Sequence, residues 1–299
     1  MPDEMRIGMI GLDTSHVERF ISVLNDPEFE HYRRGFPVVT AYPAGSPDFA
    51  LSIDRVEGYT DLARRRGVEI VGSPEAVAER ADAILMTSVD GRTHREFFER
   101  VAPAGKPVFI DKPFAVRGAD ARSIVDTAQT SGTPVMGASS LRFEDDLVAA
   151  LADDAAGPIQ GCDFAGPMEI EPTQPGLFWY GIHTVEMVYA ALGCGCARVR
   201  AISEERRDTI IGEWADGRVA TLRGCRTGNH AFFGMLHRET ASRHVRTGIG
   251  RPKYVNLLDR VIEFFCTGDP AVDPHETVET IRFIEAANRS RETGESVDL

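Results

Sequence analysis

The first 140 residues alternate short apolar runs with stretches of helical periodicity, and this alternation restricts the possible folds more than any other feature. Ile7–Ile10 reads as a buried strand, and apolar side chains then recur at helical spacing from Val17 to Leu24. Further strands are expected at Val38–Tyr42, Val68–Val71, Ala83–Thr87, Val108–Ile110 and Val135–Met136. Strands joined by helical crossovers pair in parallel and are covered on both faces. We therefore predict a doubly wound α/β domain over residues 1–140.

Residues 141–299 follow a different pattern, because consecutive strand-like segments are separated by tight turns such as Asp216-Gly217. These segments are Ile159–Phe164, Arg198–Ser203, Thr209–Trp214, Val219–Cys225 and His230–Leu236. Helices are expected at Gly181–Leu192, at Tyr254–Phe265 and from an N-cap at Asp273 through Ala287. The pattern predicts an α+β domain with a mostly antiparallel sheet, whose terminal helix could also pack back on the first domain.

Charge and composition exclude several classes of function. The net charge of −13 argues against nucleic acid and against anionic membrane surfaces, since both are bound by clustered Lys and Arg. No apolar run approaches the ~20 residues that span a bilayer, and the N-terminus lacks a secretory signal pattern. Five cysteines, an odd number, favour a reducing cytoplasm. Cys194 and Cys196 form one close pair, which fits small residues at a helix end better than a metal site.

Three stretches should share one edge of the first sheet, because ligands of an open parallel sheet bind outside the carboxyl ends of its strands. They are Gly11–His16, Thr87–His94 and the triplet Asp111-Lys112-Pro113. The first stands where a dinucleotide-binding G-x-G-x-x-G would stand, and its three glycine positions read Gly11, Asp13 and His16. Asp13 could repel a pyrophosphate. Alternatively, it could cap the following helix, as could its two neighbours.

Two further local signals bear on chemistry. The second strand ends in Ala41-Tyr42-Pro43, without the acid that would bond the ribose of NAD. Lys112 follows a strand and precedes a proline that fixes the turn. A lysine in such a cleft can transfer a proton or stabilise a developing alkoxide, although most lysines are only solvated surface groups.

Five motifs occur in order along nearly the whole chain: "MIGLDTSH", "DAILMTSVDGRTH", "GKPVFIDKP", "SSLRF" and "YGIHTVE". Together they resemble the glucose–fructose oxidoreductase, inositol dehydrogenase and MocA (Gfo/Idh/MocA) family of nicotinamide-dependent oxidoreductases. The resemblance implies a Rossmann domain that binds NAD or NADP, followed by an antiparallel sheet domain. Asp111-Lys112-Pro113 matches the family's E-K-P motif, and Gly181-Ile182-His183 matches the end of its D-x-G-x-H motif.

The resemblance also implies roles for individual residues. Lys112 and His183 are the expected catalytic groups. The expected cofactor contacts are Gly11, Leu12, Asp13, Thr14, Ser15, His16, Ser88, His94, Asp111 and Lys112. The expected substrate contacts are Arg142, Trp179, Tyr180 and His183. No metal site is expected.

One position departs from the family pattern, since Trp179 stands where the catalytic aspartate would fall. An indole cannot take a proton. His183 titrates in the right range to serve as the base, and Lys112 would steady the alkoxide or relay the proton. Glu186 lies three residues beyond His183 and could orient it from the same helical face.

The sequence thus predicts an NAD(P)-dependent oxidoreductase that acts on a sugar, inositol or similar polyol. One alternative is a nucleotide-binding protein without turnover. Another is a metal-dependent lyase or isomerase with ligands among His94, His183, His230, His237 and Glu186. A homodimer or homotetramer is expected, because apolar side chains on one face of the second sheet would otherwise meet water. The side chains assigned to that face are Ala220, Leu222, Phe232 and Met235.

Overall fold

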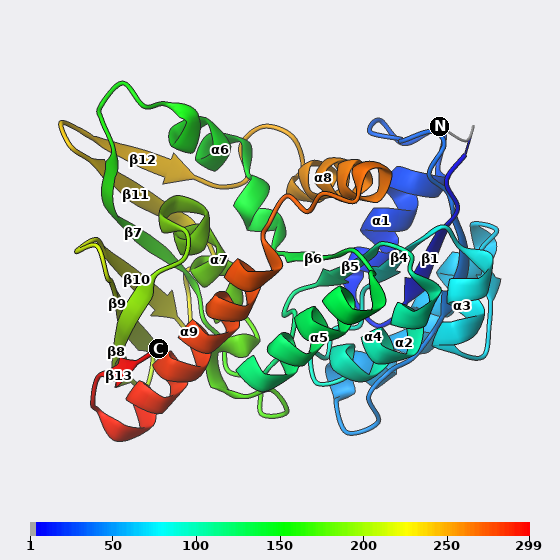
Figure 1. The fold of residues 1–299 in the computed structure, drawn as a ribbon, viewed down its shortest axis with the longest axis horizontal. Helices are drawn as coiled ribbons and strands as arrows, with labels where there is room; N and C mark the ends of the chain where they lie inside the picture. Colours follow the sequence, from blue (N-terminus) through cyan, green and yellow to red (C-terminus); the bar gives the residue numbers. More distant parts are fainter. Residues whose placement is uncertain (1–3) are drawn as a thin grey trace. The chain divides into compact units, whose positions relative to one another are not determined.

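A parallel sheet of six strands lies at the centre of the first of two units in the computed structural model, which describes residues 4–299 (Figure 1). Its strands are β1 (Ile7–Ile10), β2 (Val38–Tyr42), β3 (Glu69–Ile70), β4 (Ala83–Met86), β5 (Val108–Asp111) and β6 (Val135–Ala138). They lie in the order β3-β2-β1-β4-β5-β6 and all pair in parallel. This is the strand order of dinucleotide-binding folds, whose ligand site lies where the order reverses, between β1 and β4.

Every residue of β1, β4, β5 and β6 is buried. Helices therefore cover both faces of this sheet. The connecting elements are α1 (Ser15–Asn25), α2 (Ala50–Arg65), α3 (Pro74–Arg80), α4 (His94–Val101), η1 (Ala102–Ala104) and α5 (Gly118–Ser131). Packing is tight enough that a Cβ on Gly8 would lie 2.3 Å from a methyl carbon of Val77 in α3. The expected doubly wound fold is confirmed.

The second unit is built on a sheet of seven strands in the order β12-β11-β7-β10-β9-β8-β13. Among its described strand pairs, β7 with β10 is the parallel one and the others are antiparallel. The strands are β7 (Ile159–Pro167), β8 (Cys196–Glu204), β9 (Arg207–Trp214), β10 (Val219–Cys225), β11 (Phe233–Arg238), β12 (Ser242–Arg246) and β13 (Val297–Asp298). The helical segments are η2 (Ser140–Phe143), α6 (Asp145–Ala152), η3 (Gly176–Phe178), α7 (Gly181–Leu192) and α9 (Pro274–Thr293). The expected mostly antiparallel sheet is therefore present.

One face of this second sheet is covered by α7 and α9, and the residues on each face differ from those expected. A Cβ on Gly212 would lie 2.7 Å from Phe283 of α9. Ala220 and Leu222 are fully buried on this covered face, so their assignment to an open face was wrong. Since side chains alternate along a strand, Val219 is on the other face and is 42% exposed.

The chain passes between the units more than once. Residues 119–138 and 257–274 group with the segment that ends at Ala115, whereas 116–118, 139–256 and 275–299 form the second unit. Helix α8 (Lys253–Thr267) thus belongs to the first unit from Leu257 onward, although the sequence pattern placed it within a domain of residues 141–299. Asp259 of α8 bonds to Arg33 of the first unit at 2.7 Å. Within residues 4–299, no helix has the length and apolar character needed to cross a membrane.

Candidate functional site

Gly11 brings the loop after β1 close to the loop after β4. Its φ of +96° lies in the left-handed region that favours glycine. A Cβ here would lie 2.3 Å from the backbone nitrogen of Ser88. The first glycine of the fingerprint is therefore required both by backbone conformation and by a close approach of two loops at the switch point.

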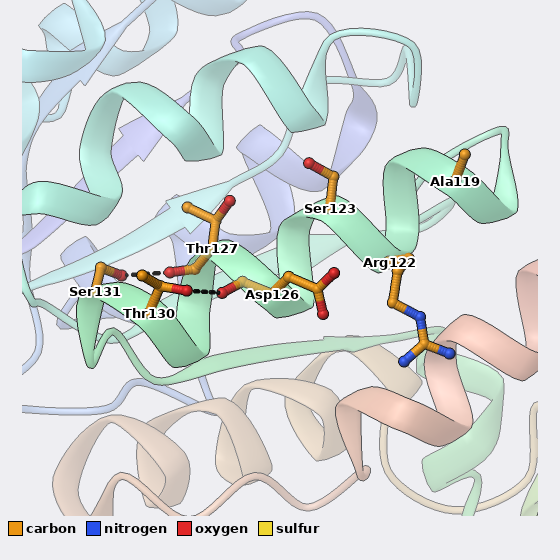
Figure 2. Close-up of a pocket in the computed structure, with 7 residues that line it drawn as sticks. All are labelled: Ala119, Arg122, Ser123, Asp126, Thr127, Thr130 and Ser131. Atoms are coloured by element: carbon orange, nitrogen blue, oxygen red, sulfur yellow. Dashed lines mark hydrogen bonds between the residues drawn. The ribbon is translucent and has the colours of Figure 1, made fainter.

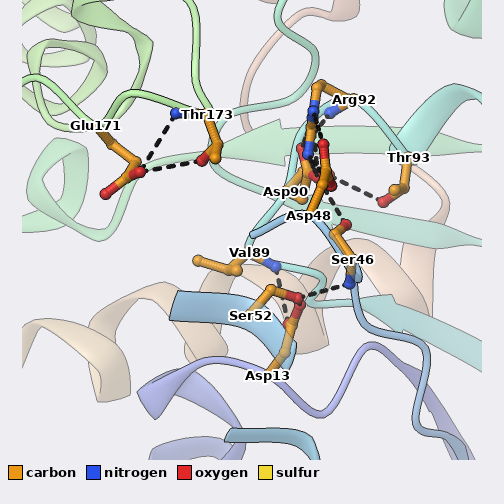
Figure 3. Close-up of polar contacts among 10 residues, drawn as sticks. All are labelled: Asp13, Ser46, Asp48, Ser52, Val89, Asp90, Arg92, Thr93, Glu171 and Thr173. Atoms are coloured by element: carbon orange, nitrogen blue, oxygen red, sulfur yellow. Dashed lines mark hydrogen bonds and ion pairs between the residues drawn. The ribbon is translucent and has the colours of Figure 1, made fainter. Parts of the chain in front are cut away.

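Asp13, at the second glycine position, turns its carboxylate into the unit (Figure 3). Oδ2 accepts a hydrogen bond from Ser52 Oγ in α2 at 2.6 Å, and Oδ1 accepts from the backbone N–H of Val89 at 2.9 Å. The side chain is 1% exposed. Burial raises the pKa of this carboxyl, and the hydrogen bonds from Ser52 and Val89 oppose part of the rise. Asp13 thus ties three segments together instead of capping α1.

A second carboxylate continues this connection between the loops after β2 and β4 (Figure 3). Ser46 donates to Asp90 at 2.6 Å, and its N–H donates to Ser52 Oγ at 2.9 Å. Arg92 binds both Asp90 and Asp48 through paired contacts of 2.7–3.0 Å. Hydrogen bonding to Arg92 lowers the pKa of Asp48. We name this set the loop cluster: Asp13, Ser46, Asp48, Ser52, Asp90 and Arg92.

The start of α1 offers donors to an anion. Thr14 is the N-cap, its side chain accepting weakly from His16 N–H at 3.5 Å. The N–H groups of Asp13, Thr14 and Ser15 have no acceptor in the described part of the chain. Such unsatisfied N–H groups at a helix N-terminus bind phosphate or carboxylate. Because Asp13 turns its charge inward, these donors remain available.

His16, at the third glycine position, links α1 to the strand that ends in the D-K-P triplet. Its Nδ1 pairs with Asp111 Oδ2, and both side chains are almost fully buried. Asp111 also accepts from the backbone N–H of Lys112 at 2.9 Å. Burial alone would raise the pKa of Asp111, but the charge and hydrogen bond of His16, helped by Lys112, outweigh it and lower the pKa.

His94 connects the loop after β4 to the loop after β5. It is fully buried, with Nε2 2.8 Å from the carbonyl oxygen of Ser88 and Nδ1 2.9 Å from that of Pro113. Both ring nitrogens thus contact protein carbonyls, which indicates that His94 supports the loops rather than contacting a cofactor. It fixes the residue next to Lys112, whose peptide bond to Pro113 is cis. Lys112 itself is half-buried.

One buried polar atom at this edge lacks a partner within residues 4–299. The Oγ of Ser88 is buried without a hydrogen bond, although Ser88 N and Oγ lie within 2.6 Å of where a Gly11 Cβ would be. Buried hydroxyls in native structures usually have a partner in the protein, in water or in a ligand. Together with the donors at the start of α1, this hydroxyl fits a bound dinucleotide at the predicted position.

In the second unit, His183 lies in the first turn of α7 and is the one residue from Gly181 to Tyr189 that is not buried. Its Nδ1 lies 2.7 Å from Ser139 Oγ. The imidazole is flanked edge-on by Tyr180 and by Phe232, with ring centroids 5.8 and 5.7 Å away. Ser139 was not among the residues expected from sequence, where only its place in the "SSLRF" motif could have drawn attention to it.

Trp179 and Tyr180 immediately precede α7. Their rings meet edge-on with centroids 6.2 Å apart, so the indole, Tyr180 and His183 form a continuous aromatic series. The connection from β7 is also held locally, since Glu171 accepts two hydrogen bonds from Thr173 (Figure 3). Trp179 is therefore linked to His183 through the ring of Tyr180.

Arg142 is committed to carboxylates inside the second unit. Its Nε donates to Glu186 at 2.8 Å, and its Nη2 donates to Glu276 of α9. Arg142 is 8% exposed and Glu186 is 4% exposed. These ion pairs join η2, α7 and α9. Arg142 and Glu186 therefore have a structural role that the sequence did not suggest.

Neither the surface hollow along α5 nor any group of metal-ligating side chains among residues 4–299 adds a ligand site. A shallow hollow runs along α5, lined by Ala119, Arg122, Ser123, Asp126, Thr127, Thr130 and Ser131 (Figure 2). Thr130 and Ser131 donate to carbonyls one turn back in the same helix, and no expected site residue lines the hollow. Among residues 4–299, no three His, Cys, Asp or Glu side chains are grouped as metal ligands would be.

The first unit matches a known family. Residues 5–138 match the Gfo/Idh/MocA model, described as an oxidoreductase family with an NAD-binding Rossmann fold. Inositol 2-dehydrogenase from Cereibacter sphaeroides is 31% identical over 152 residues, which cover 50% of this chain and 40% of that protein. The first three curated relatives are matched over 38–48% of their own length.

Solved structures extend the similarity of fold to nearly the whole chain. A putative myo-inositol dehydrogenase from Sinorhizobium meliloti aligns with a TM-score of 0.79 at 18% identity, over 98% of this chain and 99% of that one. The myo-inositol dehydrogenase from Lactobacillus casei, in complex with NAD(H) and myo-inositol, aligns at 0.79 and 14% identity, over 99% and 97%. The strand order, the donors at the start of α1 and the family match agree. Residues 5–138 of this chain therefore form an NAD-binding Rossmann fold of the Gfo/Idh/MocA type.

Proposed function

We propose that this protein is an NAD(P)-dependent oxidoreductase that transfers a hydride between nicotinamide and a sugar, inositol or similar polyol. One observation carries the proposal: at the switch point of a 3-2-1-4-5-6 sheet, three N–H groups and the Ser88 hydroxyl have no hydrogen-bond partner among residues 4–299. The matched relative acts, by its name, on inositol. Residues 5–138 supply the family's NAD-binding fold.

The residues of the first unit would hold the dinucleotide by backbone rather than by side-chain charge. The N–H groups of residues 13–15 would bind the pyrophosphate, and Gly11 allows the close approach. The bound nicotinamide would supply the hydride acceptor or donor. Asp13 would keep the loops in place while its carboxylate stays bonded to Ser52 and Val89.

Lys112 and His183 are the proposed groups that act on the reacting oxygen. A secondary alcohol must lose its hydroxyl proton as its hydride leaves, and a lysine amine or an imidazole can receive that proton. Lys112 is held at the end of β5 by the buried Asp111 and by the His94 contact to Pro113. His183 is held by Ser139 and by flanking rings.

Trp179 and Tyr180 are the proposed substrate contacts, because an aromatic face suits stacking on a sugar ring and a phenol can donate a hydrogen bond. We assign Arg142 a structural role, since its guanidinium already binds two glutamates. The alternative of a nucleotide-binding protein without turnover is supported by Trp179 in place of an aspartate.

We further propose that the protein forms a homodimer or homotetramer in the cytoplasm. The open face of the second sheet carries apolar side chains at Val219, Phe233 and Ile202, which are 39–53% exposed. Pairing two such faces would remove them from water. The five free thiols suit a reducing compartment. Light scattering that shows a monomer at micromolar concentration would contradict the assembly.

Calorimetry with NAD, NADH, NADP and NADPH tests the cofactor, and a screen of sugars and polyols at fixed nicotinamide tests the activity. We expect at least one dinucleotide to bind at sub-millimolar concentration and at least one polyol to be oxidised. Dinucleotide binding with no turnover across the screen would support the non-catalytic alternative. No binding of any dinucleotide at millimolar concentration would overturn the proposal.

A further inference from the structure

The surroundings of Ser139 determine which group donates in its hydrogen bond with His183. Both residues belong to the second unit, and Ser139 is fully buried just after β6. Its Oγ lies 2.7 Å from His183 Nδ1 and also accepts from the backbone N–H of Leu141 at 3.3 Å. These are the two hydrogen-bond partners of this hydroxyl within the described chain.

Counting donors and acceptors fixes the direction of that bond. A serine hydroxyl has one hydrogen to donate and two lone pairs that accept. Leu141 N–H uses a lone pair, and no carbonyl or carboxylate among residues 4–299 accepts the hydrogen. If His183 Nδ1 were the donor, the buried Ser139 O–H would have no acceptor, which is the costly arrangement. The hydroxyl therefore donates to Nδ1.

We infer that Ser139 is a positioning residue that keeps neutral His183 with its proton on Nε2, so that this imidazole is a hydrogen-bond donor to the substrate oxygen. The inference rests on the proposed function for the presence of a substrate. A carboxylate partner would do the opposite, because it accepts from Nδ1–H and leaves a lone pair on Nε2. His183 then keeps its proton, and the hydroxyl proton of the alcohol goes to the amine of Lys112.

The chain supplies a matched control in His237, on the open face of the second sheet. Its Nδ1 lies 2.9 Å from Ser242 Oγ, and its Nε2 lies 2.6 Å from Asp163 Oδ2. Ser242→Ala removes a serine–histidine contact of the same kind in the same unit, at residues outside the proposed machinery. It should leave both His183 and turnover unchanged.

Side-chain ¹H–¹⁵N spectra of ¹⁵N-labelled protein, at a pH where the rings are neutral, test the tautomer without any substrate. His183 signals are assigned with His183→Asn. We expect a protonated Nε2 and an unprotonated Nδ1 whose shift reports a hydrogen bond. That bond should be lost in Ser139→Ala and kept in Ser139→Thr. A protonated Nδ1 in the native protein would overturn the inference, even if Ser139→Ala does not fold.

Kinetics on a verified substrate test the consequence. Ser139→Ala should lower kcat by roughly ten- to a hundred-fold through a misplaced imidazole, with KM changed less and the Kd for dinucleotide unchanged. Ser139→Thr should restore kcat, and Ser242→Ala should match the native enzyme. Full kcat in Ser139→Ala would refute the positioning role. Absence of any substrate would count against the proposed function, whereas the spectra would still decide the tautomer.

Discussion

The two units hold their candidate functional groups by opposite means. In the first unit, buried charges hold the loops: His16 pairs with Asp111, and the loop cluster joins Asp13 to Asp90 through Ser52 and Ser46. In the second unit, a neutral hydroxyl and two aromatic rings hold His183. Charges in the first unit point inward and leave backbone N–H groups available. The neutral contact in the second unit controls where one proton sits.

This difference follows from what each unit has to present. An anion site at a helix N-terminus works through N–H groups, so side-chain charge is useful there only where it stays out of the site. A single imidazole works through one nitrogen, and a charged partner would change which nitrogen carries the proton. Variants that remove a charge from the first unit should therefore act differently from variants that alter the neutral contact in the second.

The largest effect is expected from Lys112→Met compared with His183→Asn. Methionine keeps most of the apolar volume of the lysine stem but cannot carry a proton, so kcat should fall by about 10²- to 10⁴-fold while the Kd for dinucleotide stays the same. Asparagine still donates a hydrogen bond, so His183→Asn should lose less. Steady-state kinetics and calorimetry measure both. Equal losses would break the proposed division of roles.

Asp111→Ala should destabilise the fold strongly. It removes one partner of a buried pair, leaves His16 buried without its carboxylate, and should lower the free energy of unfolding by about 3 kcal/mol. Asp82→Ala is the control, since its pair with Arg6 is exposed on both sides and should be worth at most about 1 kcal/mol. Urea unfolding at neutral pH compares them. Similar losses would show that burial of the charge does not matter.

Asp13→Gly restores the second glycine of the fingerprint, yet we expect it to weaken dinucleotide binding. The carboxylate bonds to Ser52 and Val89, and its loss should lower the free energy of unfolding by about 1–3 kcal/mol and loosen the loop after β4. Calorimetry measures the binding, with Ser52→Ala as the milder partner variant. Tighter binding in Asp13→Gly would mean that Asp13 repels the pyrophosphate.

The smallest effect concerns pH. The pKa of Asp13 is raised in the folded protein, so the folded state binds this proton more tightly than the unfolded chain. This group therefore adds stability as the pH falls from above its folded pKa toward its unfolded value of 3.8. The pKa of Asp111 is lowered, so its contribution is instead lost as the pH falls through its folded pKa.

Urea midpoints of the native protein and of Asp13→Asn, measured from pH 7 to pH 4.5, isolate the Asp13 contribution. The stability of the native protein relative to that of Asp13→Asn should rise as the pH falls. If the urea midpoint of the native protein instead exceeded that of Asp13→Asn by more at pH 7 than at pH 4.5, the pKa of Asp13 would be lowered by folding and not raised.

The strands of the first unit could be predicted to within about two residues, because buried parallel strands are continuous apolar runs. Helix α2 was not predicted: its N-cap, Phe49, has no side chain that can cap it, and Ser52 and Thr60 are among its few buried residues. Strand β12 is short and mostly polar, and β11 begins at Phe233 rather than His230. Local periodicity carries little signal for such segments.

The sequence predicts where the candidate site lies, but it does not predict the side-chain contacts that the structure shows there. The D-K-P triplet and the start of α1 are expected at one sheet edge because both follow the carboxyl ends of parallel strands. The partner of Asp13 is 39 residues away in α2, and that of His183 is 44 residues away. Which way a side chain turns over such separations depends on tertiary packing. The sequence therefore could not distinguish an inward-facing Asp13 from one that repels phosphate.

Helix α8 closes the first unit from far along the chain, and this has a consequence for synthesis on the ribosome. Val261 and Phe264 of α8 are fully buried, and Ala271 beyond it contacts Met136 of β6. Residues 139–256 are translated before this cover exists. The apolar surface that α8 covers in the first unit therefore stays exposed until most of the second unit has been synthesised. A fragment that ends at residue 138 would keep this surface exposed and would be prone to aggregation.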